Sequence, residues 1–277
     1  MNTKLTVIVD NISNEGMCGE WGLSILAEYK DRKILIDTGG SALFLDNMRK
    51  LGIDVNDIDY GVLSHAHYDH ANGMPAFFEN NSHAKFYLRE DAAENCYKKK
   101  FIFHKYIGLP RNVLRDYPDR IEKVSGDYRL MEGAFLIPHK TGGLAEVGKR
   151  ELMYRKISAG WIPDDFSHEQ SLVLDTDKGL VIINSCSHGG AVNIINEVRD
   201  TFPGKHVYGL IGGFHLFNKK DDDIRNVARK IKETGIDYVC TGHCTGQRAF
   251  DILKEELGEG LDQLSTAFEM EFGIGGS

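Results

Sequence analysis

Short apolar runs separated by turn-forming residues dominate the first third of the chain and predict β-strands. Such runs lie at residues 5–9, 23–28, 33–37, 60–63 and 85–88. Each has the length of a strand and ends at polar or glycine-containing segments. Helical patterns follow at about residues 41–51 and after Gly73. The first third therefore predicts a sheet with a few helices packed against it.

A repeated order of strand and then helix marks the last third of the chain. Residues 171–175 and 180–184 predict a hairpin, and a helix is expected at about 191–200. Strands predicted at 208–211 and 238–241 are each followed by a helix. Two β-then-α halves of this kind would form an α/β fold, a four-layer αββα sandwich. Strand-like runs end near His65, His188, His215 and His243, so we expect these histidines at one edge of the two sheets.

The middle of the chain, from about residue 90 to 165, has no regular pattern. Gly108-Leu109-Pro110, Tyr117-Pro118 and Thr141-Gly142-Gly143 interrupt it with turn signals. We therefore expect a single domain over 1–277 with a cap-like segment inserted at about 90–165.

Composition favours an ordinary globular protein, with 42% hydrophobic and 27% charged residues in 277. The N-terminal apolar run is too short for a signal-peptide core, and nowhere is an apolar stretch long enough to cross a bilayer. Five cysteines, an odd number without the spacing of a small disulfide-rich domain, suit a reducing compartment. These features predict a cytoplasmic protein that does not bind membranes.

The formal net charge of −8 argues against general affinity for nucleic acid, but one segment is locally basic. Residues 98–123 contain eight basic side chains against three acidic ones, with aromatic residues interleaved. This segment could recruit an anionic small molecule by charge and stacking, or it could be a solvated face with its aromatic side chains in the core. The candidate substrate-binding residues are Lys98, Lys99, Lys100, His104 and Tyr106.

The segment with the most candidate metal ligands follows the strand-like run at 60–63 and reads Ser64-His65-Ala66-His67-Tyr68-Asp69-His70. His65 and His67, two apart in extended chain, point the same way, whereas Asp69 and His70 follow a turn and can reach a second point nearby. One loop could thus supply two metal ions. Two-metal hydrolytic centres hold their ions about 3.5–4 Å apart and use them to acidify a water molecule.

This motif, together with Ile34-Leu35-Ile36-Asp37-Thr38-Gly39 and the later isolated histidines, resembles the metallo-β-lactamase superfamily. The resemblance spans nearly the whole chain. It implies the αββα fold, a dinuclear metal site, and Asp37 as a buried carboxylate that orients the histidine loop without binding metal.

More narrowly, several motifs look like the dihydropterin-type subgroup, whose members are named 7,8-dihydropterin-6-yl-methyl-4-(β-D-ribofuranosyl)aminobenzene 5′-phosphate synthase. These motifs are Glu20-Trp21-Gly22-Leu23-Ser24, Ser185-Cys186-Ser187-His188-Gly189-Gly190, Ile211-Gly212-Gly213-Phe214-His215-Leu216 and Thr241-Gly242-His243-Cys244-Thr245-Gly246. Such an enzyme would join a pterin methyl diphosphate to an arylamine ribosyl phosphate. The resemblance also suggests a homodimer.

The resemblance implies a ligand set. His65 and His67 would bind the first metal, Asp69 and His70 the second, and His243 would complete the second site. His188 is favoured as the third ligand of the first metal, although His168 or Cys186 could take that place.

In many superfamily members an aspartate that bridges the metals ends the hairpin, and Cys186 stands at that position here. As a thiolate, Cys186 would favour zinc or iron; otherwise it is a small buried apolar side chain. We expect two divalent ions, with zinc first and manganese or iron as alternatives.

The candidate catalytic residues are Asp69 and His215. His215 follows a pair of glycines that let the backbone approach a ligand, so its ring could face the substrate or exchange a proton with it.

The leading hypothesis is a dinuclear metal enzyme acting on a phosphorylated or pyrophosphorylated small molecule, with dihydropterin–arylamine condensation as the reaction that the resembled subgroup implies. A metal-dependent hydrolase of a phosphodiester, lactone or thioester is the alternative. A di-iron redox protein is more remote, because Ala66 replaces the acidic residue of such relatives and no flavin domain follows in this sequence. A non-catalytic binder is disfavoured because the ligand set looks intact.

Overall fold

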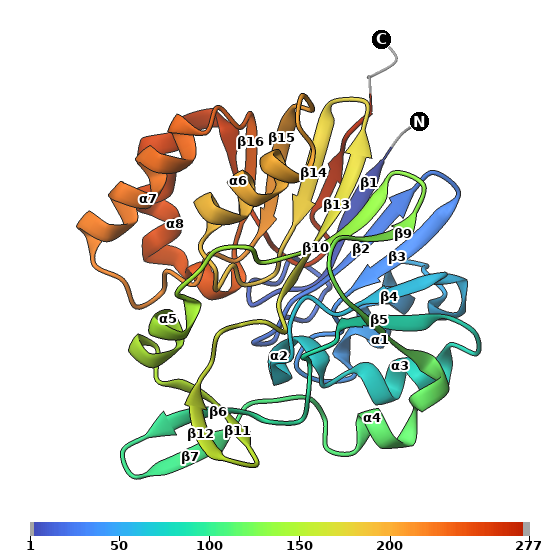
Figure 1. The fold of residues 1–277 in the computed structure, drawn as a ribbon. Helices are drawn as coiled ribbons and strands as arrows, with labels where there is room; N and C mark the ends of the chain where they lie inside the picture. Colours follow the sequence, from blue (N-terminus) through green and yellow to red (C-terminus); the bar gives the residue numbers. More distant parts are fainter. Residues whose placement is uncertain (1–2, 274–277) are drawn as a thin grey trace.

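The computed structural model describes residues 3–273 and contains two large sheets packed face to face (Figure 1). Each of these sheets has seven strands within the described residues, and a separate sheet of four strands lies at one end. None of the helices in residues 3–273 is long and apolar enough to cross a bilayer.

The first large sheet has the strand order β18-β1-β2-β3-β4-β5-β8. Its strands are antiparallel from β18 to β3 and parallel from β3 to β8. The strands are β1 (Lys4–Val9), β2 (Ser24–Tyr29), β3 (Arg32–Ile36), β4 (Tyr60–Val62), β5 (Lys85–Arg89), β8 (Ile121–Val124) and β18 (Glu269–Glu271). The helices of this half are α1 (Leu43–Lys50), α2 (Tyr68–Ala71), α3 (Met74–Asn80) and α4 (Val113–Asp116), with short 3₁₀ turns η1 (Val55–Asp57) and η2 (Pro118–Arg120).

The second large sheet repeats this plan in the order β17-β16-β15-β14-β13-β10-β9. It is antiparallel from β9 to β14 and parallel from β14 to β17. The strands are β9 (Tyr128–Met131), β10 (Ala134–Pro138), β13 (Gln170–Thr176), β14 (Gly179–Ile183), β15 (Val207–Gly212), β16 (Tyr238–Thr241) and β17 (Leu261–Gln263). Its helices are α6 (Ala191–Thr201), α7 (Asp221–Glu233) and α8 (Gln247–Leu257), with η3 (His243–Thr245) and η4 (Gly258–Gly260).

Three apolar clusters hold the layers together, because both faces of each large sheet are covered. Ile25 and Ile36 of the first sheet meet Leu172 and Ile183 of the second in the central cluster. A second cluster joins the first sheet to α1 and α3, and a third joins the second sheet to α6, α7 and α8 (Figure 1). This confirms the predicted four-layer αββα arrangement.

The small sheet has the order β12-β11-β6-β7. Its strands are β6 (Cys96–Lys100), β7 (Phe103–Tyr106), β11 (Met153–Ile157) and β12 (Gly160–Pro163), with α5 (Leu144–Arg150) before β11. The expected cap at about 90–165 takes in more chain than this sheet, because β8, β9 and β10 belong to the large sheets. Strands β8 and β9 are short and only partly buried, so their sequence carries a weak strand signal. Strand β10 is apolar and mostly buried, but it lies between turn signals in the irregular middle of the chain.

Candidate metal centre

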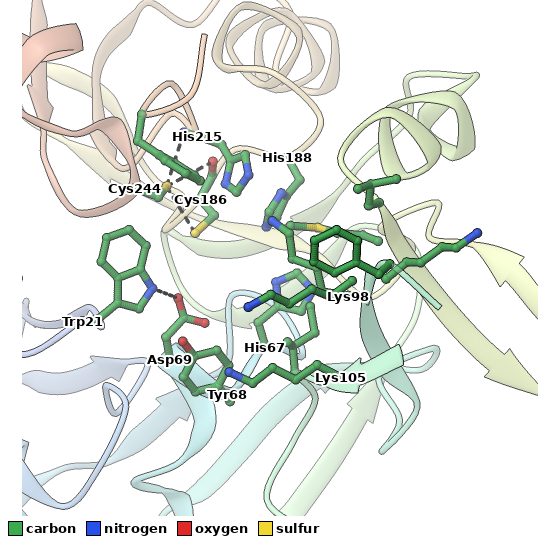
Figure 2. Close-up of a pocket in the computed structure, with 17 residues that line it drawn as sticks. Trp21, His67, Tyr68, Asp69, Lys98, Lys105, Cys186, His188, His215 and Cys244 are labelled. Carbon is green, nitrogen blue, oxygen red and sulfur yellow. Dashed lines mark hydrogen bonds between the residues drawn. The ribbon is translucent and has the colours of Figure 1, made fainter. Parts of the chain in front are cut away.

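The strands β4, β14, β15 and β16 end at one edge of the two large sheets, and the loops that follow them carry the candidate histidines. His65 follows β4, His188 follows β14, His215 follows β15 and His243 follows β16. The side chains gather at this edge although up to 178 residues separate them in the chain: the ring of His188 lies beside those of His65 and His215, and the ring of His243 lies beside that of His70. Figure 2 shows His188 and His215 side by side.

Three of these loops contain a non-glycine residue with left-handed backbone torsions, and Asp37, which follows β3, is a fourth such residue near the centre. The φ angles are 60° at Asp37, 52° at Ser187, 50° at His215 and 48° at His243. This conformation costs roughly 1–3 kcal/mol at a non-glycine residue and persists only where the surroundings hold it. At these four positions the strain lies shortly after the end of a strand.

The first donor group consists of His65, His67 and His188. One ring nitrogen from each lies within 4.8 Å of the others. Nε2 of His65 and both nitrogens of His188 are buried and, within residues 3–273, have no hydrogen-bond partner. Unpaired buried nitrogens are costly unless a ligand satisfies them, so this group suits a metal ion.

Electrostatics keep these imidazoles neutral, as metal ligands must be. Burial, with the neighbouring His168 ring, lowers the pKa of His67 to about 3. Burial and the surrounding rings also hold the pKa values of His65 and His188 well below the ordinary histidine value.

The second donor group consists of Asp69, His70 and His243. Oδ2 of Asp69 lies 3.6 Å from Nε2 of His243 and 3.8 Å from Nε2 of His70. Burial raises the pKa of Asp69, but the adjacent imidazoles outweigh it and hold that pKa below its usual range. Burial alone would lower the pKa of His70, yet the nearby carboxylates of Asp69 and Asp37 raise it to about 9.

A set of buried hydrogen bonds orients these donors. Asp37 accepts bonds from the Ser64 backbone nitrogen at 2.7 Å and from the Ser64 hydroxyl at 2.6 Å, and it lies 2.9 Å from Nδ1 of His70. Nδ1 of His243 lies 3.1 Å from Oδ1 of Asn11. Trp21 Nε1 donates to Oδ2 of Asp69 at 2.9 Å (Figure 2). Asp37 therefore has the orienting place that the family resemblance implied, and Nε2 of His70 faces the centre, 3.2 Å from Sγ of Cys186.

His168 lies behind the first donor group. Its Nδ1 accepts the backbone N–H of Ala66 at 3.1 Å, and its Nε2 lies 3.1 Å from Oδ2 of Asp164. Both ring nitrogens are thus engaged by the protein. His188 lies beside His65 and His67 with both ring nitrogens free of protein partners in the described chain. His168 also lies near these rings, but it has no free nitrogen.

His215 lies beside His188, with ring centroids 4.6 Å apart. Its Nε2 is 3.7 Å from Oε2 of Glu151, which Lys219 also contacts. Burial lowers the pKa of His215, but Cys244 and Glu151 raise it to about 9. The ring can therefore carry a proton at neutral pH at the rim of the centre.

A cavity of about 710 Å³ opens above the two donor groups. Lys98 and Lys105 are cross-strand partners on β6 and β7, and their amino groups extend toward the centre (Figure 2). The cavity is lined by Trp21, His67, Tyr68, Asp69, Lys98, Lys99, Lys100, Phe101, Lys105, Ile107, Leu152, Met153, Cys186, His188, His215, Phe217 and Cys244.

Two predicted substrate-binding residues lie elsewhere. Among the described residues, those lining the cavity do not include His104 or Tyr106. His104 stacks on Trp161 with centroids 3.8 Å apart, and Tyr106 packs under the Arg111 guanidinium at 3.5 Å. Side chains alternate between the faces of a strand, so the ring of His104 and the amino group of Lys105 point to opposite sides.

A family model described as the metallo-beta-lactamase superfamily matches residues 22–243. The chain belongs to the metallo-β-lactamase superfamily. A curated relative from Methanocaldococcus jannaschii, named 7,8-dihydropterin-6-methyl-4-(beta-D-ribofuranosyl)-aminobenzene-5'-phosphate synthase, is 28% identical and covers 98% of this chain and 97% of that protein.

Solved structures of the superfamily agree with this assignment. A crystal structure described as a metal-dependent hydrolase of the beta-lactamase superfamily is 30% identical, covers 98% of this chain and 99% of that chain, and has a TM-score of 0.83. The metallo-beta-lactamase fold protein YhfI from Bacillus subtilis has a TM-score of 0.60 at 12% identity, covering 98% of this chain and 99% of that chain, and it supports the fold alone.

The superfamily is metal-dependent, and the donors present here fit a pair of ions. The nitrogens of His65, His188 and His243 that would face the ions are the ones left without partners inside the described chain. The opposite nitrogens of His65, His70 and His243 are held by Ser64, Asp37 and Asn11. In His65 and His243 one ring nitrogen has a protein partner and the other is open, which is typical of metal-binding histidines.

Sequence reasoning missed a buried network that supports His188. Glu169 accepts the backbone N–H groups of His188 at 3.1 Å and Gly189 at 3.3 Å. His139 bonds Glu169 on one side and Glu197, at 3.1 Å, on the other. Glu169 stands next to His168 in the sequence, but nothing in chain order connects it with His139.

Phe166 was missed as well. Its ring is parallel to that of His188, with centroids 4.5 Å apart and an interplanar angle of 1°. A single phenylalanine between turns has no signal in sequence that marks it as support for a metal ligand.

Proposed function

We propose that this member of the superfamily is a two-metal enzyme acting on a phosphorylated or pyrophosphorylated small molecule. One observation carries the proposal: two adjacent donor groups with unpartnered buried nitrogens lie beneath a cavity lined by lysines. The donors suit metal ions, and the lysines suit an anion.

Two metals in these positions would supply Lewis acidity to an anionic substrate. His65, His67 and His188 would hold the first, and Asp69, His70 and His243 the second. Zinc is the expected metal because nitrogen donors predominate, with manganese or iron as alternatives.

The side chains around the donors divide the remaining tasks. Lys98 and Lys105 attract the anionic group, and Phe101 and Leu152 add apolar surface to the wall of the cavity. His215, protonated at neutral pH, is placed to give a proton to a leaving group. Trp21 holds the Asp69 carboxylate through its indole N–H.

For the substrate we propose a dihydropterin methyl diphosphate that reacts with an arylamine ribosyl phosphate. The name of the Methanocaldococcus jannaschii relative supports this choice. Both reactants are anionic, and a cavity of about 710 Å³ is in the range that accommodates such molecules.

Hydrolysis of a phosphodiester, lactone or thioester is the second candidate. The 30% identical crystal structure described as a metal-dependent hydrolase favours it. The same donors, lysines and proton donor would serve this reaction, so the two candidates differ in the nucleophile that enters the cavity.

The test combines metal analysis with substrate trials. Protein purified without oxygen or added metal should contain about two zinc, or two manganese, ions per chain. Turnover should be measured with the pterin diphosphate plus arylamine, and separately with a phosphodiester, a lactone and a thioester. Two iron ions per chain, with no turnover in these trials, would instead favour the redox alternative.

Matched histidine variants provide the control. His65→Ala should lose metal and turnover together, whereas His83→Ala, an exposed histidine before β5, should keep both. Full turnover in His65→Ala, or turnover of none of the substrates by metal-loaded protein, would contradict the proposal.

Three further expectations concern surroundings and partners. We propose that the protein works in the cytoplasm, binds no nucleic acid and forms a homodimer. Sedimentation of the purified chain would test the dimer.

A further inference from the structure

Phe217 lies in the turn after β15 and lines the cavity above the two donor groups. Its side chain is 42% exposed, and that of Trp21, which also lines the cavity, is 46% exposed. The two rings meet edge to face, with centroids 6.1 Å apart and an interplanar angle of 83°. We call this pair, Trp21 and Phe217, the aromatic corner.

Exposed large apolar side chains gather around this cavity. Within residues 3–273, four of the eight such side chains line it, namely Trp21, Phe101, Leu152 and Phe217. Single exposed apolar residues are ordinary, whereas a group of them around a concave surface marks a ligand site. Phe101 and Leu152 adjoin strands of the small sheet, and the aromatic corner adjoins β2 and β15 of the large sheets.

Contacts within the protein hold the aromatic corner in place. The indole N–H of Trp21 donates to Oδ2 of Asp69 at 2.9 Å, and the backbone N–H of Phe217 donates to the carbonyl oxygen of Cys244 at 3.3 Å. The backbone at Gly246 approaches so closely that a Cβ there would lie 3.1 Å from Cβ of Phe217. A surface that is already ordered loses little conformational entropy when it binds a ligand.

The aromatic corner and the cavity lysines lie on different sides of the donors. In Figure 2, Lys98 and Lys105 extend from the small sheet, whereas Trp21 lies on the other side, next to Asp69. A ligand that reaches from the aromatic corner to the lysines therefore passes over the proposed metal positions.

The geometry of the aromatic corner suits a flat ring. Aromatic rings prefer offset stacking or edge-to-face contact. Because the rings of Trp21 and Phe217 are nearly perpendicular, a flat ring between them can stack on one and present its edge to the other. A purely aliphatic substrate has no such face and would gain only from burial of apolar surface.

We propose that Phe217 is a specificity-determining residue, which together with Trp21 binds a planar ring of the substrate while Lys98 and Lys105 bind its anionic group. The bond that joins the ring-bearing part to the anionic group then lies over the proposed metal positions. The site accordingly selects phosphates or diphosphates that carry a planar ring over aliphatic esters. This inference rests on the proposed function.

Phe217→Ala tests the ring-binding role, whereas Trp21 is left unaltered because it also holds the carboxylate of Asp69. Zinc-loaded protein is titrated in a calorimeter with two probes that cannot be hydrolysed. One is 1-naphthylmethylphosphonate, a planar ring joined to an anion, and the other is methylphosphonate, the same anion without a ring. We expect Phe217→Ala to weaken binding of the naphthyl probe about tenfold, as loss of an aromatic stack does, and to leave binding of methylphosphonate unchanged.

Three matched variants separate stacking from other effects. Phe217→Tyr keeps the flat ring and should bind the naphthyl probe as the unaltered protein does. Phe217→Leu keeps apolar bulk without a flat face and should bind this probe more weakly than Phe217→Tyr. Phe103→Ala removes an exposed phenylalanine that does not line the cavity, so it should bind both probes normally.

Two results in the variants would overturn the inference. One is undiminished binding of the naphthyl probe by Phe217→Ala, and the other is equal weakening of both probes, which would mean that Phe217 only maintains the shape of the site. Equal binding by Phe217→Leu and Phe217→Tyr would likewise contradict a preference for planar rings.

The unaltered protein distinguishes this inference from the proposed function. If it binds methylphosphonate and gains no affinity from the naphthyl group, the ring-binding role fails while the two-metal site for an anion stands. If zinc-loaded protein binds neither probe, the result contradicts the proposed function itself, and the inference falls with it.

Discussion

At the scale of single residues, Asp37 determines how the second donor group is presented. It is fully buried and connects Ser64, Ser185 and the ring of His70. Because Nδ1 of His70 is held by this carboxylate, Nε2 faces the metal position and would give up its proton when a metal binds.

We predict that Asp37→Asn weakens binding of the second metal about 10–100-fold, the usual range for loss of a supporting carboxylate. The asparagine amide has one acceptor oxygen and no negative charge, so it cannot accept hydrogen bonds from all three partners as the carboxylate does. A competition titration against a chelator measures the change. Ser185→Ala, which removes one hydrogen bond and leaves the charge, should have a smaller effect, and equal losses in the two variants would contradict this reasoning.

We predict that His139 makes a pH-dependent contribution to the free energy of unfolding. Burial lowers its pKa, but Glu169 and Glu197 outweigh burial and raise it to about 10. The unfolded chain should have a value of about 6.5 for this residue. The contribution is therefore fully present below about pH 6.5 and is lost as pH rises toward 10.

The free energy of unfolding of zinc-loaded protein, measured from pH 6 to 10, checks this prediction. The difference in stability between the unaltered protein and His139→Gln should shrink as pH rises. A difference that is constant across this range would mean that His139 is neutral in the folded protein.

At the scale of elements, the β6–β7 hairpin forms a wall of the cavity. Its strands pair Lys98 with Lys105, and the tip exposes Phe101, Ile102 and Phe103. The apolar tip is exposed while the lysines face the cavity, so the hairpin can contact a substrate without being part of the core.

We predict that Lys98→Gln and Lys105→Gln each raise KM for an anionic substrate roughly fivefold, since one charge near an anion contributes about 1 kcal/mol. The value of kcat should change little, because neither amine is among the proposed metal ligands. Steady-state kinetics at several salt concentrations measures both quantities.

Lys156→Gln is the matched control for the hairpin. Lys156 belongs to the same small sheet, but its amine lies over the Trp161 ring at 5.3 Å. If KM rises in this control as much as in the hairpin variants, then a positive charge anywhere on the small sheet attracts the substrate, and Lys98 and Lys105 have no special role.

Element prediction from sequence succeeded where burial is regular. Most strands and helices of the first and last thirds are predicted within a few residues, because both faces of the large sheets are packed and their strands are strongly apolar. The short strands β17 and β18 and the short helix α2 are not predicted. The small sheet was not predicted. Its strands β6 and β7 consist largely of lysine and aromatic residues with one solvated side, which gives no clear period.

At the scale of the whole molecule, the proposed metal centre joins the two halves. His65, His67, Asp69 and His70 come from the first sheet, whereas His188 and His243 come from the second. Bound ions would therefore link loops that otherwise meet only through hydrogen bonds and packing.

We predict that removing the metals lowers Tm by about 10 °C. A ligand present at a thousand times its Kd stabilises the folded state by about 4 kcal/mol. In a chain of this size each kcal/mol of stabilisation raises Tm by roughly 2–4 °C. Thermal unfolding with and without a chelator measures the shift. His65→Ala should respond less to the chelator, and an equal response would place the stabilising ion elsewhere.

The sequence by itself determined the layered α/β fold, the family and the motif of His65, His67, Asp69 and His70. These features are local, because strand period and ligand spacing are written in consecutive residues. Chain order could not choose between His168 and His188, since both lie near the same hairpin.

Only the tertiary structure decided which distant residues meet. In the folded chain both nitrogens of His168 have protein partners, whereas those of His188 have none among the described residues. His104 and Tyr106 do not line the cavity. The tertiary structure also brought Cys186 beside Cys244, and Glu169 beside His139. The physical reason is that packing of two sheets sets which loops share an edge and which face of each strand is turned inward, and neither is encoded in local spacing.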